Sequence, residues 1–407
     1  METEAPGNYP FTGGRLELER EYRQLLRRRP VARVTTPTGD LAWLVTGYAE
    51  CRSALESPYF DRGLISEPTG PRQQEATMPP DAFNGMRLLT EAGMAGEVMR
   101  HLSKRRVAQH RPWLRRFADR LFTDMFSGGP PADLMADFAA PYPLAVMCRV
   151  LGLNVARQDG RMPRPDEERL GHWAELAFSF NSRSAAELRE GWEQLRAYLA
   201  DEVARERRQP SGGMLSTLVR ACDDKRVLDE KQLLDVTALL LNVGHKTLTS
   251  FLGLAAVDLL RHPEQARRLA HDPAGLMPSA VEELLRHVLI EVRGVARIAT
   301  ERVELGGAAI EPGDLVVIAL HAADQDPRSF PDPDRLDLAR DPGTEHLAFG
   351  AGQHMCPGSL LARAQITTAL EALAPRLPAL SLAVPPTDLT WADGLILRTP
   401  TAVPVTW

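Results

Sequence analysis

The sequence predicts a mainly α-helical protein with a small β region, and three stretches indicate this. Residues 233–260 are the most apolar run, but polar and charged residues interrupt them, which is typical of a buried helix and not of a membrane span. Residues 166–220 are rich in charge and are interrupted at Pro210–Gly213, which predicts helices separated by a turn. Residues 31–45 contain the turn signal Pro37–Asp40 between two apolar runs, which predicts a hairpin.

Composition limits the class of protein. The 407 residues are 44% hydrophobic and 25% charged, which is ordinary for a globular protein with a large core. A formal net charge of -6 does not favour a nucleic-acid binder. The cysteines Cys51, Cys148, Cys222 and Cys356 are too few for a disulfide framework in so long a chain and fit a reducing compartment. The first residues lack the basic and apolar regions of a secretory signal, so we expect a cytoplasmic protein without a membrane span.

The stretch from Phe349 to Gly358 holds one cysteine, Cys356, among turn-forming glycines directly before an apolar helical pattern. A helix N-terminus lowers the pKa of a thiol and favours the thiolate, which suits a soft or borderline metal such as iron. No second cysteine lies within zinc-site spacing, and the glycine spacing differs from that of a dinucleotide-binding loop. A buried free thiol is the competing interpretation of a lone cysteine.

The ten residues as a set are far more specific than the cysteine alone. They resemble the heme-binding loop of the cytochrome P450 family, Phe-x-x-Gly-x-x-x-Cys-x-Gly, with a histidine two residues before the cysteine. The resemblance implies the cytochrome P450 fold in a single domain over residues 1–407, with residues 1–14 loosely ordered. It also implies that heme b is the cofactor and that Cys356 is the proximal ligand of its iron. The implied heme-binding residues of the loop are Phe349, Gly350, His354 and Gly358.

Two further motifs match segments of the family that bind the heme propionates. His101 and Arg105 are expected to be i, i+4 neighbours on one helix face, a spacing that can hold an anion and that also occurs on solvated helices. The stretch from Gly294 to Thr300 resembles the strand whose arginine binds a propionate. The resemblance therefore assigns propionate contacts to His101, Arg105 and Arg297.

The stretch from Leu239 to Thr247 places Gly244 and Thr247 three residues apart on one helix face. A glycine inside a helix costs about 1 kcal/mol relative to alanine. A glycine at this position can be explained either by the close approach of a flat cofactor to the backbone or by plain helix packing. The threonine hydroxyl can bond to a carbonyl one turn back and open the helix locally. The resemblance makes Thr247 the oxygen-activating hydroxyl and Gly244 a part of the oxygen groove.

This stretch departs from the family pattern twice. Val243 stands where a small residue is usual, which narrows the space over a heme. Lys246 replaces the usual acid, and an ammonium with an ordinary pKa of about 10.4 gives up its proton poorly near neutral pH. Burial can depress that pKa and restore a catalytic proton relay through Lys246; otherwise the side chain points outward. Glu291 is an alternative acid, although no spacing argument places it.

Glu283 and Arg286 lie at i, i+3 and can pair on one helix face, as many soluble helices allow. In the family this Glu-x-x-Arg pair is buried, has a third partner from a later loop and orders the cysteine region. Arg335 stands where that partner belongs, which gives a structural cluster of Glu283, Arg286 and Arg335.

Residues 67–84 are rich in Pro, Gly and Gln without a clear period, which predicts a long loop that can cover a pocket. Simple packing of this loop against the core is the competing interpretation of its apolar residues. The residues expected to line a substrate pocket are Phe83, Met86, Leu88, Phe178, Val243, Glu291 and Val292.

Residues 100–116 contain seven basic residues and no acidic one. Such a run is either a solvated face or a docking surface for an acidic electron donor. We predict a heme-thiolate monooxygenase that oxidises a small-molecule or natural-product intermediate with O2 and with electrons from ferredoxin and ferredoxin reductase. One alternative is peroxide-driven oxidation or oxidative coupling, which depends less on the missing acid. The other alternative is a non-catalytic helper protein.

Overall fold

The computed structural model describes residues 7–11, 13–66, 70–73, 80–154, 162–179, 183–341 and 343–407. Its contacts divide the chain into two compact units. Unit 1 comprises Met1–Ala76, Pro278–Cys356 and Ile396–Arg398, and unit 2 comprises Thr77–Met277, Pro357–Leu395 and Thr399–Trp407. The single domain over residues 1–407 stays a prediction.

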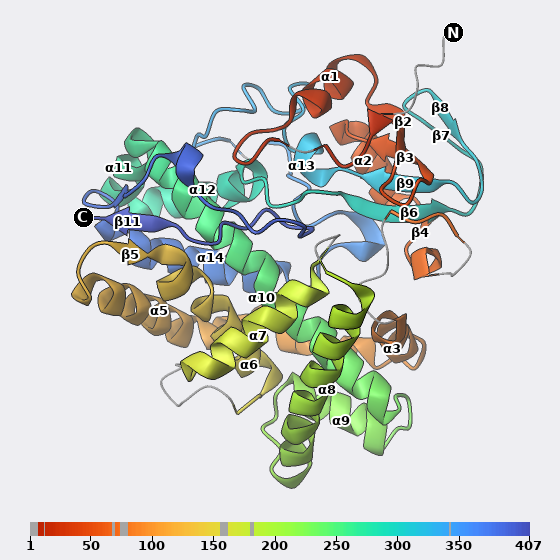
Figure 1. Cartoon of the computed structure of the whole chain (residues 1–407), viewed down its shortest axis with the longest axis horizontal. Coiled ribbons are helices and arrows are strands. Elements are labelled where there is room, and N and C mark those ends of the chain that lie inside the picture. The colour runs from red at the N-terminus through yellow and green to blue at the C-terminus, as the bar shows by residue number, and fades with distance from the viewer. Residues whose placement is uncertain are drawn as a thin grey trace. The chain divides into compact units, whose positions relative to one another are not determined.

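Unit 1 is built on a six-stranded sheet with the strand order β1-β2-β3-β9-β6-β4 (Figure 1). Its strands are β1 (Gly7–Asn8), β2 (Val31–Thr35), β3 (Leu41–Val45), β4 (Phe60–Asp61), β6 (Val295–Ala299) and β9 (Leu315–Ile318), and β7 (Val303–Leu305) pairs with β8 (Ala308–Ile310). Its helices are α1 (Arg20–Arg28), α2 (Tyr48–Glu56), α13 (Leu320–Ala323), the 3₁₀ helices η1 (Gly63–Ser66) and η4 (Gly352–His354), and most of α12 (Pro273–His287).

The predicted hairpin is confirmed, because β2 and β3 pair antiparallel with Val31 opposite Val45. Gly39 in its turn has a φ of +84°, a conformation that glycine adopts without strain. β1 pairs with β2, and Tyr9 is buried in the core of unit 1. The loose order expected of residues 1–14 stays a prediction.

Unit 2 is mainly helical. Its helices are α3 (Pro80–Glu91), α4 (Ala95–Met99), η2 (Arg100–Leu102), α5 (Lys104–Ser127), the π-helix η3 (Met135–Ala139), α6 (Pro141–Leu151), α7 (Arg164–Ala177), α8 (Ala185–Arg208), α9 (Met214–Asp223), α10 (Glu230–Arg261), α11 (Pro263–His271), α14 (Ser359–Leu373), η5 (Ala374–Arg376) and η6 (Pro386–Asp388). A small sheet joins β10 (Ser381–Leu382), β11 (Pro404–Thr406) and β5 (Ala132–Asp133).

The long helix α10 is the centre of unit 2 and contacts α3, α6, α7 and α8 (Figure 1). It begins at a capping box in which Asp229 accepts the amide of Gln232, an arrangement that satisfies free N–H groups of the first turn. The predicted buried helix over 233–260 is confirmed. Within the part of the chain that the structure describes, no helix combines the length and apolar character that crossing a membrane requires.

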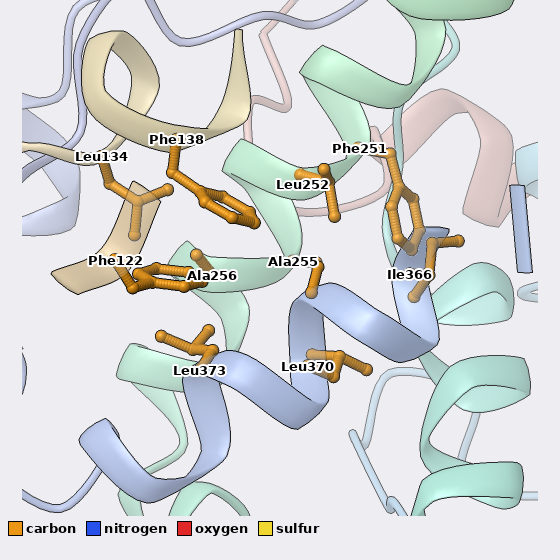
Figure 2. A pocket seen from close by; sticks show the side chains of 11 residues that line it. Phe122, Leu134, Phe138, Phe251, Leu252, Ala255, Ala256, Ile366, Leu370 and Leu373 are labelled. Atoms are coloured by element: carbon orange, nitrogen blue, oxygen red, sulfur yellow. The ribbon is translucent and has the colours of Figure 1, made fainter. Parts of the chain in front are cut away.

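In its C-terminal half, α10 packs against α5, η3 and α14. Figure 2 shows Phe122, Phe138, Phe251 and Leu370 converging from these elements on a small gap. The gap holds about 10 Å³, which is scarcely room for one water molecule, and its walls are apolar. It is a packing defect of the core and not a ligand site.

The expected loop over 67–84 is wrong at its end, because α3 begins at Pro80. A Pro at the first helical position is favoured because its missing N–H would have no partner there. Residues 67–69 and 74–79 lie outside the described part of the chain.

Candidate active site

The cysteine loop in unit 1 is held in shape by its own backbone. The Gly350 N–H donates to the Leu347 carbonyl at 2.7 Å, and the Cys356 N–H donates to the Phe349 carbonyl at 2.8 Å. Gly350 and Gly352 have φ values of +69° and +68°, where other residues are strained. A Cβ at Gly352 would also lie 2.6 Å from the Leu55 carbonyl oxygen of α2. These glycines therefore fix the path of the loop, and α14 begins three residues after Cys356, as the sequence predicts.

Glu283 and Arg286 form a buried, two-pronged ion pair on α12. Arg286 donates through Nε and Nη2 to the two Glu283 oxygens at 2.8 and 2.9 Å, and both side chains are almost fully buried. The pairing predicted from their spacing is confirmed. Such a fork fixes direction as well as charge, because both N–H groups need the same carboxylate plane.

The third member of this cluster is Arg340, and the prediction of Arg335 is wrong. Arg340 Nε donates to Glu283 Oε2 at 2.9 Å, and its other nitrogens donate to backbone carbonyls that include that of Arg335. The Arg335 side chain is 66% exposed and lies 3.7 Å from Asp337. The loop that follows Pro331 turns back at Asp332, which has a φ of +46°, and so presents Arg340 to the pair.

Two contacts link this cluster to the start of the cysteine loop. The Asp324 carbonyl accepts from Arg286 at 2.9 Å, and Asp324 Oδ1 accepts the Leu347 N–H at 2.6 Å. The neighbouring His346 lies 3.0 Å from Glu282 of α12. Burial, opposed by His346, the Leu347 amide and Arg286, raises the pKa of Asp324 to about 7. The cluster is therefore connected to the loop through one buried residue, Asp324, by its backbone carbonyl and its carboxyl group.

Cationic side chains gather beside the cysteine loop, where an anionic group would be stabilised. Arg297 is 6% exposed and donates to the Ala296 carbonyl at 2.8 Å. Among the described residues no carboxylate forms an ion pair with it, although a buried charge without a counter-charge is costly. Burial, and then Arg62, lower the pKa of Arg297 to about 10. Partial burial, followed by Arg297 and Arg62, also lowers the pKa of His354. These residues of unit 1 fit a cofactor that carries carboxylates, such as heme b.

Unit 2 contains an exposed stripe on α10, which is otherwise largely buried. Val243 is 42% exposed, and Leu240, Gly244 and Thr247 are half-buried, at the spacing of one helix face. Thr247 Oγ1 donates to the Val243 carbonyl at 3.0 Å, as the sequence allows, but α10 runs without interruption through this turn. An apolar stripe left open on a central helix is typical of a ligand-facing surface.

Gly244 has a packing reason. A Cβ at this position would lie 2.5 Å from Met147 Cε and 2.6 Å from Met147 Sδ of α6. The glycine therefore lets α6 approach α10. This supports helix packing, one of the two explanations for Gly244 that the sequence left open. A part for Gly244 in an oxygen groove stays a prediction.

Lys246 points neither to solvent nor along the exposed stripe. Its Nζ donates to Glu175 Oε1 of α7 at 3.0 Å, and its side chain is 6% exposed while that of Glu175 is 45% exposed. Of the two alternatives that the sequence left open, the outward-pointing lysine is contradicted, because Lys246 is buried and paired with Glu175 of α7. A proton relay through Lys246 stays a prediction.

His101 and Arg105 do not share one helix face, so that geometric expectation is wrong. His101 lies in η2, Arg105 lies in the first turn of α5, and Ser103 between them is extended at φ -66° and ψ 154°. His101 Nε2 lies 3.1 Å from Thr217 Oγ1, and Arg105 is exposed. Partial burial lowers the pKa of His101, helped by the arginines Arg106, Arg220 and Arg100. Their contact with a propionate stays a prediction.

The predicted pocket residues lie in both units. In unit 2, Met86 and Leu88 are half-buried on α3, Phe178 is buried at the end of α7, and the Phe83 side chain lies outside the described part of the structure. In unit 1, Glu291 Oε2 lies 3.2 Å from His321 Nδ1, and the Val292 N–H donates to the Ile396 carbonyl at 3.1 Å. The Glu291 carboxylate is thus engaged by a histidine, which gives no support to its use as a substitute acid.

Comparison with known proteins identifies this set of features. Residues 170–388 match the family model described as Cytochrome P450. The mycinamicin IV hydroxylase/epoxidase of Micromonospora griseorubida is 37% identical over 413 residues, with 100% of each chain covered. The nocardicin C N-oxygenase of Nocardia uniformis subsp. tsuyamanensis is 35% identical, with 98% of each chain covered. The solved LnmA cytochrome P450 hydroxylase of Streptomyces atroolivaceus has a TM-score of 0.83 at 38% identity, over 98% of this chain and 100% of that one.

The helical fold with its small sheets and the cysteine loop thus define a heme-thiolate oxidoreductase. The chain belongs to the cytochrome P450 family. Its cofactor is heme b, which when bound supplies the iron centre for oxygen chemistry. Cys356 would be the thiolate ligand of this cofactor, and Arg297 with His354 would face its carboxylates; these roles stay predictions, and the positions of the residues described above are compatible with them.

Sequence reasoning missed two residues of this region, Arg62 and Arg340. A turn-rich stretch around residues 331–340 gave no signal for which arginine would face Glu283. Arg62 follows Phe60-Asp61, and only the pairing of β4 with β6 brings it near Arg297.

Proposed function

We propose that this cytochrome P450 is a cytoplasmic monooxygenase that oxidises a largely apolar small molecule or natural-product intermediate. The observation that supports this most is the stripe of Leu240, Val243 and Thr247 on α10, where apolar side chains and one hydroxyl remain open in a buried helix. The relatives named above are a hydroxylase/epoxidase and an N-oxygenase. A similar oxidative tailoring reaction is the class of chemistry we propose here.

We further propose that a ferredoxin, reduced by a ferredoxin reductase, donates the electrons. Within unit 2, Arg111 and Arg115 pair with Glu371 at 3.0 and 2.8 Å, and Arg115 also pairs with Asp119 at 3.0 Å. Lys104 and Arg106, by contrast, are exposed and have no carboxylate partner among the described residues. A patch of free positive charge raises the encounter rate with an acidic partner and does so less at high salt.

The test compares electron sources. NADPH-driven product formation with a ferredoxin and its reductase is measured beside peroxide-driven product formation. Charge reversal of Lys104 and Arg106 to Glu should slow the NADPH-driven reaction and weaken its salt dependence, and leave the peroxide-driven reaction unchanged. Lys225→Glu on an exposed loop of unit 2 is the control. Equal rates for the reversed and control variants would refute the docking surface.

A peroxide-driven enzyme is the second candidate function. The observation that favours it is Lys246, whose ammonium is held by Glu175 at a position where the family usually has an acid. Product formation with peroxide but none with NADPH and the ferredoxin system would decide for it. A protein that binds heme and forms no product by either route would instead be the non-catalytic helper. We rank this candidate last, because the Glu283–Arg286–Arg340 cluster is intact.

A further inference from the structure

Asp324, the residue that follows α13, holds the segment that leads into the cysteine loop. Its Oδ1 accepts the Leu347 N–H at 2.6 Å, and Asp324 and Leu347 are each only 2% exposed. The two residues are 23 positions apart in the chain, and both belong to unit 1. A buried N–H group needs an acceptor, and here a carboxyl group from another segment supplies it. This hydrogen bond therefore ties the start of the loop to the end of α13.

The backbone of Asp324 is itself held on two sides. Its N–H donates to the Leu320 carbonyl of α13 at 3.0 Å, and its carbonyl accepts from Arg286 Nη1 at 2.9 Å. Arg286 is fixed in turn by both carboxylate oxygens of Glu283. The acceptor that Leu347 meets thus belongs to a residue whose position is set by a helix and by a buried ion pair.

Backbone hydrogen bonds continue from Leu347 to Cys356. The Leu347 carbonyl accepts the Gly350 N–H at 2.7 Å, and the Phe349 carbonyl accepts the Cys356 N–H at 2.8 Å. Leu347 therefore bonds through its N–H to Asp324 and through its carbonyl to the turn that carries the cysteine. A displacement of Leu347 would move this turn, because the two backbone bonds close one short stretch of chain.

We propose that Asp324 is a positioning residue that, through the Leu347 N–H, keeps Cys356 in the geometry of a thiolate ligand. This inference rests on Cys356 being the ligand of heme b. Groups that hydrogen-bond to the surroundings of a metal ligand fix its orientation, and their loss weakens ligation although they never touch the metal. Without the Asp324 acceptor the buried Leu347 N–H would be unsatisfied, and a movement of the loop that exposes this group to water would relieve the cost.

The test uses the heme-loaded enzyme, reduced and treated with carbon monoxide, and does not depend on turnover. The red-shifted absorption of thiolate-ligated heme is followed as it converts to the unshifted absorption of heme that has lost the thiolate. All variants are measured at one temperature below their unfolding midpoints. Asp324→Ala should raise the rate of this conversion about tenfold, because it leaves a buried donor unsatisfied. Asp324→Asn keeps an acceptor for the Leu347 N–H and should convert within about twofold of the wild-type rate.

Asp314→Ala is the matched control. Asp314 also belongs to unit 1 and accepts a backbone N–H, that of Glu311 at 3.0 Å, while its other side-chain partners among the described residues are Trp43 and Arg33. The control should lower the melting temperature and leave the conversion rate unchanged. A wild-type conversion rate in Asp324→Ala, or an equal rise in Asp314→Ala, would overturn the positioning role.

Two further outcomes are distinguishable. If Asp324→Ala does not fold, the conversion rate of Asp324→Ser decides in its place, because the serine oxygen lies closer to the backbone and weakens the bond to Leu347. A wild type without the red-shifted absorption would refute Cys356 as the ligand, and this inference with it. A wild type that has the absorption, together with unchanged rates in the Asp324 variants, would overturn the inference alone.

Discussion

Lys246 on α10 is paired with Glu175 on α7, with 3.0 Å between Nζ and Oε1. The family pattern places an acid at the lysine's position. In this chain the carboxylate is supplied by the neighbouring helix, and the ammonium occupies the buried end of the pair. In this chain α10 therefore carries the positive charge of the pair and α7 the negative one, whereas the family pattern places a negative charge on α10.

Removal of the carboxylate should destabilise the protein more than removal of the ammonium. Glu175→Gln leaves a lysine that is 6% exposed without its counter-charge, whereas Lys246→Met leaves a glutamate that is 45% exposed and can turn to water. We expect Glu175→Gln to cost about 1–3 kcal/mol, less than a fully buried pair because solvent screens this one, and Lys246→Met to be close to neutral. Urea unfolding of both variants measures this. A larger loss in Lys246→Met would contradict the account.

Exchanging the two charges of the Lys246–Glu175 pair distinguishes the effect of the ion pair on stability from the effect of an acid on proton delivery. Lys246→Glu alone places two carboxylates side by side and should destabilise the protein. The double variant Lys246→Glu/Glu175→Lys restores the pair and places the acid on α10. If the missing acid limits proton delivery, the double variant should convert a larger fraction of consumed NADPH into product than the wild type. If a stable double variant converts the same fraction of consumed NADPH into product as the wild type, the missing acid does not limit proton delivery.

Arg340 should matter for stability and Arg335 should not. Arg340→Ala removes one charged hydrogen bond to the buried Glu283, which keeps its pair with Arg286, and should cost about 1.5–3 kcal/mol. Arg335→Ala alters a side chain that is 66% exposed and should stay within about 0.5 kcal/mol of the wild type. Denaturant unfolding, with heme content recorded in parallel, compares the two. Equal losses would mean that Arg335 is the third member after all.

The buried carboxyl of Asp324 should make stability depend on pH in an unusual direction. Its pKa is raised to about 7 in the folded chain, chiefly by burial, against about 3.9 when unfolded. Between these values the unfolded group has lost its proton and the folded group keeps it, so its contribution to stability falls as the pH rises from about 4 to 7. Asp324→Asn keeps an acceptor for the Leu347 amide and should become more stable relative to the wild type over this interval. A constant difference between pH 4 and 8 would exclude this titration.

Local spacing predicted the parts of the site that lie within one segment. Glu283 and Arg286 pair because i, i+3 residues on a helix are neighbours, and the turn of the cysteine loop follows from its glycines. Long-range placement could not be obtained in this way. Arg340 contacts Glu283 across a loop whose path no periodicity reveals, and the effect of Arg62 on the pKa of Arg297 depends on the long-range pairing of β4 with β6.

The sequence contains helix-start signals at two places where the predictions were wrong. Ser103 is a good helix-starting residue, and a helix that begins just after it separates His101 from Arg105. Pro80 marks the start of α3 in the same manner. The sequence could not decide between a buried and an outward-pointing Lys246, because its partner Glu175 on α7 is 71 positions away in the chain.

The proposed role of Cys356 as the thiolate ligand of the heme is tested most directly by one measurement. The reduced protein is treated with carbon monoxide and its absorption is compared with that of Cys356→Ala. We predict the red-shifted absorption after which the family is named in the wild type, and its loss in Cys356→Ala. A wild type without that absorption, or a Cys356→Ala variant that retains it, would contradict the account.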